Sequence, residues 1–101
     1  MVEVIILNKA QEDLEEIGAY LARFSEKSAG LHLERIFKAI ESLKTFPLLG
    51  KIFLELDYPK VREIKAGPYR IFYHIVSETK IHILTIHHSA TPFDWDELKP
   101  N

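Results

Sequence analysis

The chain has 101 residues, of which 47% are hydrophobic and 28% charged, and its formal net charge of −2 is a poor basis for nonspecific binding to nucleic acid, which requires a clearly basic surface. This length fits one domain, residues 1–101, and no apolar run approaches the ~20 residues that a membrane span needs. There is no cysteine, and because a secreted domain this small would usually need disulfides, we expect a cytoplasmic protein.

The first 24 residues predict a strand followed by an amphipathic helix. Residues 2–7 are β-branched and mostly apolar, as in a short strand. Asn8 is then expected to cap a helix, with Gln11 three residues later in the capping-box position. Apolar side chains follow at helical spacing, and the acidic side chains between them are expected to face solvent. The apolar stripe is Ala10, Leu14, Ile17, Leu21 and Phe24, and the acids are Glu12, Asp13, Glu15 and Glu16.

A second helix is predicted after a break at residues 25–28, with Ser28 as its cap. Its apolar side chains continue the 3.6-residue period to about Thr45. Phe46 and Pro47 end it, because proline disfavours a helical residue before it and has no amide to donate. The link between the two helices is short, so we expect an antiparallel hairpin. The second stripe is Leu33, Ile36, Phe37, Ile40 and Leu43.

Residues 47–59 are expected to be irregular, and three strands are predicted to follow at residues 61–66, 69–77 and 80–88. The turns between these strands are short, so the strands are expected to be antiparallel. The predicted fold is therefore α+β in the order β-α-α-β-β-β, with an antiparallel helical hairpin packed on one face of a mainly antiparallel four-stranded sheet. The other face is expected to be open, and residues 92–101 are expected to form a C-terminal arm.

The turns also predict which side chains share a face of the sheet. Arg70 is expected opposite Lys65 on one neighbouring strand and opposite His87 on the other. Like charges opposed in this way either pair with Glu63 or bind an anionic partner. The helix-facing side is expected to carry Ile64, Ile71, Tyr73, Ile75, Leu84 and Ile86. The candidate residues for binding an anion or a target are Arg62, Lys65, Arg70, His74, His87 and His88.

The stretch VREIKAGPYRIFYHI, residues 61–75, resembles the signature of the RelE/ParE superfamily of type II toxin–antitoxin toxins. The shared pattern is an arginine-bearing strand, a glycine turn, Tyr-Arg-Ile-x-Tyr, and a last strand ending near His87. Further residues that resemble the two helices of the family are Ala10, Asp13, Leu14, Ile17, Tyr20, Ile40, Leu43, Pro47 and Gly50. The pattern from Gly67 to Arg70 is closer to ParE-like plasmid-stabilisation members than to RelE.

The resemblance implies a growth-inhibiting toxin that binds a macromolecular target and is neutralised by a partly disordered cognate antitoxin. ParE-like members poison DNA gyrase, whereas RelE-like members cut mRNA in the ribosome. Neither activity implies a cofactor or a small-molecule ligand. Gyrase is therefore the expected target, with the ribosome and its mRNA as the alternative.

RNA cleavage needs a base, an acid and cations that stabilise the charged phosphate. By position, Arg70 matches the central arginine of the family, Lys65 is a supporting cation, and His87 or His88 is the acid or base. The basic residues that ParE-like members often carry after His87 are missing here, so cleavage would rest on Arg70 and one histidine. We therefore expect protein binding, with an mRNA endonuclease or an inactive antitoxin-binding member as alternatives. The histidines lack further ligands at metal-binding spacing, so no metal site is expected.

Overall fold

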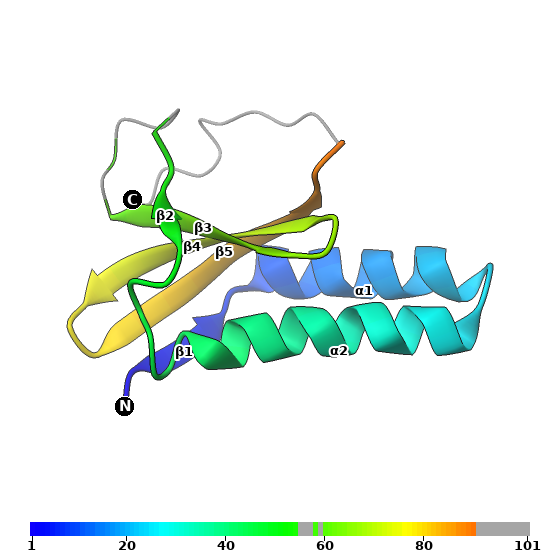
Figure 1. Ribbon diagram of the computed structural model, residues 1–101, viewed down its shortest axis with the longest axis horizontal. Coiled ribbons are helices and arrows are strands. Elements are labelled where there is room, and N and C mark those ends of the chain that lie inside the picture. Colours follow the sequence, from blue (N-terminus) through cyan, green and yellow to red (C-terminus); the bar gives the residue numbers. More distant parts are fainter. Residues whose placement is uncertain (55–57, 59, 91–101) are drawn as a thin grey trace.

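The computed structural model describes residues 1–54, 58 and 60–90, which form one sheet covered on one face by two helices (Figure 1). The elements are β1 (Glu3–Ile6), α1 (Asn8–Ala22), α2 (Glu26–Ser42), β2 (Lys51–Ile52), β3 (Val61–Ala66), β4 (Tyr69–Ser77) and β5 (Lys80–His88). The strand order across the sheet is β1-β5-β4-β3-β2. β1 and β5 are parallel, and every other neighbouring pair is antiparallel.

The predicted fold class and element order are confirmed, and the bounds of β3, β4 and β5 are those expected. The sheet has five strands where four were expected. The additional strand, β2, has two residues and lies in the segment predicted to be irregular. It forms because Lys51 and Ile52 pair with Glu63 and Arg62 at the edge of β3. The expected C-terminal arm, residues 92–101, lies outside the described residues.

Both helices begin differently from the prediction. Asn8 is the first helical residue of α1, and the N-cap is Leu7, whose side chain makes no capping hydrogen bond. The Gln11 side chain does reach back over the helix start, where its Nε2 donates to the Ile6 carbonyl oxygen at 3.0 Å. The cap of α2 is Ser25, whose hydroxyl accepts a hydrogen bond from the Ser28 amide at 3.1 Å. Sequence spacing identified the break between the helices but not the capping residue.

Most of the predicted helix stripes enter the core, with two exceptions. Ala10, Leu14, Ile36, Ile40 and Leu43 are buried in the main cluster between the helices and the sheet. Phe24 and Phe37 were expected there and are exposed instead. Phe24 lies beyond the last residue of α1, where the helix has already ended and no neighbouring element covers it.

Asp13 was expected to face solvent, and it is buried instead. Its carboxylate accepts hydrogen bonds from the Thr85 hydroxyl and from the Ile86 amide, and it pairs with Lys9 one helical turn away. β1 ends at Ile6, so the edge of β5 beyond that point has no strand beside it. Asp13 satisfies the amide exposed there, because a buried backbone donor needs a partner. The carboxylate therefore joins α1 to β5.

The predicted register holds near the β3–β4 turn and fails farther along β5. Arg70 lies opposite Lys65 and opposite His87, as expected. A bulge then shifts the pairing by one residue, so that His74 faces His82 where Ile83 was expected. The bulge also turns Leu84 away from the helices, contrary to the prediction. An extra residue in one strand reverses the alternation of side chains, which two turn lengths alone do not reveal.

Two hydrophobic clusters lie on opposite faces of the sheet. The main cluster fills the space between the sheet and the helices and includes Ile71, Tyr73, Ile81 and Ile83. The second lies on the face away from the helices and consists of Phe53, Val61 and Phe72, with Tyr58 and Leu84 packed against it. We call this side of the sheet the open face, because no helix of the described residues covers it. It was expected to be uncovered, but Phe53, Val61 and Phe72 are buried there. None of the helices within the described residues is long and apolar enough to cross a membrane.

Candidate functional site

Three candidate residues form one row across the open face. Lys65 of β3, Arg70 of β4 and His87 of β5 are consecutive cross-strand partners, so their side chains project on the same side of the sheet. They lie on the face opposite the helices, together with Phe72. The ring of His87 contacts that of Phe72 edge to face, with 6.5 Å between the ring centroids. The row predicted from the turns is therefore present.

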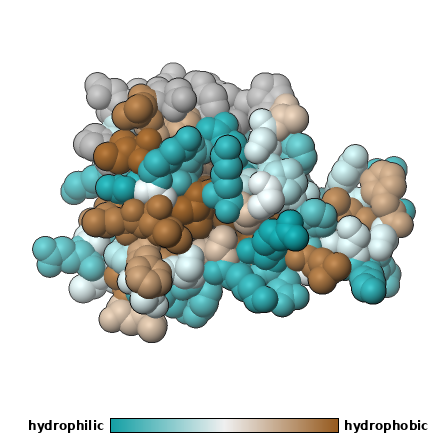
Figure 2. All heavy atoms as spheres, viewed as in Figure 1, coloured by the Kyte–Doolittle hydropathy of each residue, from teal (hydrophilic) through white to brown (hydrophobic). Residues whose placement is uncertain are grey.

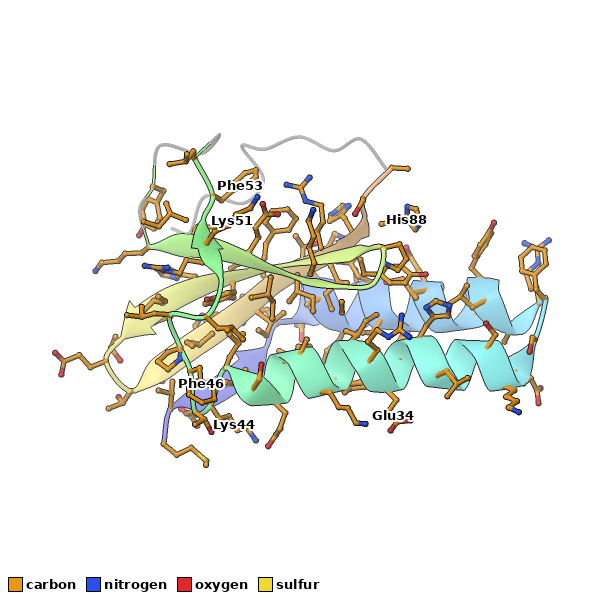
Figure 3. All side chains as sticks on the ribbon, in the orientation of Figure 1. Glu34, Lys44, Phe46, Lys51, Phe53 and His88 are labelled. Carbon is orange, nitrogen blue, oxygen red and sulfur yellow. The ribbon has the colours of Figure 1, made fainter. Side chains whose placement is uncertain are left out.

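A buried glutamate holds the central arginine of this row. The Arg70 Nε donates to Glu63 Oε2 at 2.8 Å, and Glu63 is only 5% exposed. Lys51 Nζ lies 3.5 Å from the other oxygen, Oε1. Lys51 comes from β2, at the edge of the sheet, and is labelled in Figure 3. The sequence left two possible roles for Arg70, pairing with Glu63 or binding an anionic partner. The structure shows the pair with Glu63.

Two aromatic rings lie against the Arg70 guanidinium. Its central carbon is 4.9 Å from the centroid of the Phe72 ring and 5.6 Å from that of the Phe53 ring. Phe53 follows β2 and meets Phe72 edge to face at 5.0 Å between centroids. Cation–π contacts and a charge-assisted hydrogen bond together fix the guanidinium in one orientation. Sequence reasoning did not include Phe53, because the segment that carries it was expected to be irregular.

His74 lies farther along the same face, in a small cluster of rings. Its ring meets Tyr58 at 5.6 Å and His82 at 6.5 Å between centroids. Burial lowers the pKa of His74 below its ordinary value, and the nearby His82 and Lys60 lower it further. The protonated, positively charged form of His74 is therefore disfavoured.

The remaining two candidates are not part of the row. His88 pairs with Tyr69 on the helix-facing side, with 5.5 Å between ring centroids, and its Nδ1 accepts a hydrogen bond from the Ala90 amide. Arg62 also lies on the helix-facing side, since its cross-strand partner Tyr73 belongs to the main cluster. Its Nη1 donates to the carbonyl oxygens of Gly50 at 2.7 Å and Leu48 at 3.4 Å.

A cavity of about 550 Å³ opens where α1 meets the C-terminal end of β5. Ile17 and Ile86 form its apolar part, while Lys9, Glu16 and His88 supply polar side chains. Such a volume matches the usual size of a ligand pocket. Its buried carboxylate, Asp13, is already saturated by the Lys9, Thr85 and Ile86 contacts described above. The Asp13 carboxylate is therefore not available to a ligand in this cavity.

Apart from Met1, the large exposed hydrophobic side chains of the described chain occur in two regions. One lies along the helical hairpin and comprises Tyr20, Phe24, Leu31 and Phe37. The other lies in the loop after α2, in β2 and just beyond it, and it comprises Phe46, Leu48, Leu49, Ile52 and Leu54. Figure 2 shows hydrophobic side chains gathered on the viewed face in the region of β2. Apolar surface of this kind is typical of protein-binding sites.

No metal centre is formed by the described part of the chain, where no three histidine or carboxylate side chains converge. On the open face, Phe53 and Phe72 are buried and Arg70 is paired with Glu63. Lys65 is the exposed residue of the row.

Comparison with known proteins identifies a family. The family model described as "ParE toxin of type II toxin-antitoxin system, parDE" matches residues 4–93. A search of curated protein sequences finds no match. Among solved structures, the chain is similar to one from the chromosomal ParDE system of P. aeruginosa, with a TM-score of 0.69 and 22% identity over 87% of this chain and 96% of that one. It is also similar to a chain of the RelBE2 toxin–antitoxin complex from Mycobacterium tuberculosis, with a TM-score of 0.64 and 22% identity over 86% of this chain and 96% of that one.

Proposed function

The chain belongs to the ParE toxin family of type II toxin–antitoxin systems, and on this basis we propose that it is a single-domain cytoplasmic toxin that arrests growth by binding DNA gyrase. A cognate antitoxin protein neutralises it. Both solved structures named above come from toxin–antitoxin systems, which supports a protein partner. The helical hairpin, with its exposed aromatic residues, and an edge of the sheet are the surfaces that the antitoxin covers.

The Glu63–Arg70 pair is the observation that favours target binding over RNA cleavage. A cleaving site needs cations that are available to the developing negative charge on the phosphate. Here the carboxylate of Glu63 lies 2.8 Å from Arg70 Nε and 3.5 Å from Lys51 Nζ. Arg70, the central cation of the row, is therefore already engaged by a carboxylate of the protein. A net charge of −2 also opposes docking on ribosomal RNA.

The test is to add the purified protein to DNA gyrase and to translating ribosomes in parallel. We expect gyrase supercoiling to be inhibited and no new mRNA cut sites to appear. A double variant, Arg70→Ala with His87→Ala, should weaken the inhibition if the open face contacts gyrase. The control is Lys38→Ala, which removes only an exposed pair with Glu34 on α2.

Two results would overturn this proposal in favour of the alternatives. Unaffected supercoiling together with ribosome-dependent cuts that vanish in the double variant would assign a RelE-like endonuclease. Vigorous growth on induced expression without a partner protein, with neither activity detected, would assign an inactive member that only binds its antitoxin.

A further inference from the structure

The bulge between β4 and β5 places two histidines opposite each other on the open face. His74 of β4 is the direct cross-strand partner of His82 of β5. Without the bulge, His74 would lie opposite Ile83, and His82 would point to the helix-facing side, because a shift of one residue moves a side chain to the other face. The two rings therefore share a face only because of the bulge. We call His74 and His82 the histidine pair.

The two rings of the histidine pair are close enough to bind one metal ion between them. Their centroids are 6.5 Å apart, and their planes are inclined by 76°. A first-row metal ion such as zinc lies about 2.0–2.1 Å from the imidazole nitrogen that it binds. One ion placed between the rings can therefore contact a nitrogen of each, after rotation of the rings about their side-chain torsions. The backbone does not need to move, because directly opposed residues already hold their Cβ atoms close together.

The histidine pair is accessible and in a suitable protonation state for a metal. Both residues are half-buried, so that an ion and its water ligands can reach the rings. A neutral imidazole carries a lone pair on one ring nitrogen, and this is the form that binds metal. Burial, followed by the charges of His82 and Lys60, lowers the pKa of His74 and so favours its neutral form.

The surroundings of the histidine pair determine which kind of metal site it can form. The described residues contain no group of three histidine or carboxylate side chains suited to a metal, so the pair supplies two ligands and water supplies the others. Two imidazoles fixed on neighbouring strands act as a chelate, because the second bond forms within one molecule. The Tyr58 ring packs against His74 at 5.6 Å between centroids and limits its movement. Lys60 acts in the opposite direction, since its positive charge repels a cation near His74.

We propose that His74 and His82 form a two-histidine binding site for a divalent transition-metal ion, with Cu²⁺ as the tightest ligand. Imidazole suits copper, nickel and zinc, and Cu²⁺ has the highest affinity of the divalent first-row ions. Mg²⁺ is excluded, because it requires oxygen ligands. A metal bound here joins β4 to β5 beside the bulge and stabilises the folded chain, since the unfolded chain does not hold the two rings together. The site depends neither on the toxin's target nor on its antitoxin.

The test is to titrate the full chain, without an affinity tag, with the chlorides of Cu²⁺, Ni²⁺ and Mg²⁺ in separate samples. Isothermal titration calorimetry gives the affinity and the stoichiometry. We expect one Cu²⁺ ion per chain, weaker binding of Ni²⁺ and no binding of Mg²⁺. The midpoint of thermal unfolding should rise with the concentration of Cu²⁺. Electron paramagnetic resonance of the copper sample should show coupling to two imidazole nitrogens.

Variants locate the bound metal. His74→Gln and His82→Gln should each weaken Cu²⁺ binding by about 100-fold, because either change removes the chelate. Circular dichroism reports whether each variant still folds. His88→Gln is the matched control, since it removes an exposed histidine of the same strand that lies outside the pair, and it should leave the affinity unchanged. Lys60→Gln should tighten Cu²⁺ binding, because it removes a positive charge near His74.

Three results would overturn the proposal. The first is that the chain binds no Cu²⁺, and the second is that His74→Gln and His82→Gln bind it as tightly as the unchanged chain. The third is that His88→Gln weakens binding as much as His74→Gln does, which would place the metal elsewhere on β5. Gyrase inhibition is measured without added metal, so that failure of this inference is distinguishable from failure of the proposed function.

Discussion

Glu63 is a carboxylate in the middle of the sheet with two cations around it. It is 5% exposed, and its oxygens reach Arg70 and Lys51, which come from different strands. A charge that has left water is tolerated only when its partners replace the lost hydration. The contacts of Glu63 with Arg70 and Lys51 therefore join β2, β3 and β4 on the open face. They also reduce the positive charge of that face.

Glu63→Gln should destabilise the fold by about 3 kcal/mol, because it leaves the partly buried Arg70 without its counter-charge. Urea unfolding measures the loss. Glu41→Gln, which removes an exposed pair with Lys44 on the helix, is the matched control and should change the free energy of unfolding by less than about 0.5 kcal/mol. Equal effects of the two substitutions would show that Glu63 has no special role.

His74 makes stability depend on pH on the acidic side of neutrality. Its pKa in the folded protein lies below the ordinary 6.5, chiefly through burial and then through His82 and Lys60. The folded state therefore binds a proton more weakly than the unfolded chain. The neutral form of His74 therefore contributes to the free energy of unfolding above about pH 6.5. This contribution is lost as the pH falls from that value toward the pKa of His74 in the folded protein.

Urea unfolding between pH 7.5 and 5 should thus show a fall in stability that His74→Gln reduces. Lys60→Gln removes one of the two neighbouring positive charges and should reduce it in part. An unchanged pH profile in His74→Gln would assign the acid sensitivity to other groups.

At the scale of elements, the strand periods could be predicted and the local departures from them could not. The bounds of β3, β4 and β5 follow from apolar alternation between turn residues, and the pairing of Arg70 follows from the turns. The bulge at Leu84 leaves no mark in that alternation. Asp13 has the spacing of a solvent-facing acid, and its burial depends on where β1 happens to end.

The ordered conformation of the loop that leads into β2 could not be predicted from the sequence. Its order comes from the Tyr73 hydroxyl and the Arg62 guanidinium, both more than ten residues away in the chain. No local sequence pattern predicts contacts between residues so far apart in the chain. The one available signal was Gly50, which the family resemblance included and for which a close backbone approach is the physical reason.

Gly50→Ala should cost about 1–3 kcal/mol, because its Cβ would meet the Glu63 carbonyl oxygen at 2.6 Å and the Tyr73 hydroxyl at 2.7 Å. Gly30→Ala is the matched control within α2, where a Cβ meets nothing within 4 Å. That change should stabilise the protein by about 0.5–1 kcal/mol through helix propensity. Thermal and urea unfolding of the two variants give the comparison, and the prediction is wrong if both shift in the same direction.

At the scale of the whole molecule, the two faces of the sheet differ in what they contribute to stability and in what they expose. The helix-facing side holds the main cluster, which supplies most of the buried apolar surface. The open face carries Arg70, Lys51 and Lys65, and exposed apolar residues lie in β2 and in the loop before it. Substitutions at those two surfaces can change binding while the main cluster keeps the fold, which is why exposed and buried variants were paired above.

The same topology predicts the order of folding. β3, β4 and β5 are joined by tight turns, whereas β1 must pair with β5 from the opposite end of the chain, as Val4 with Ile81. Long-range pairing costs more loop-closure entropy and tends to form late. Ile71→Val, at the centre of β4, should therefore mainly slow refolding, and Val4→Ala should mainly speed unfolding. Stopped-flow chevrons in urea measure both rates. Val4→Ala acting chiefly on the refolding limb would place the β1–β5 pairing in the transition state and contradict this order.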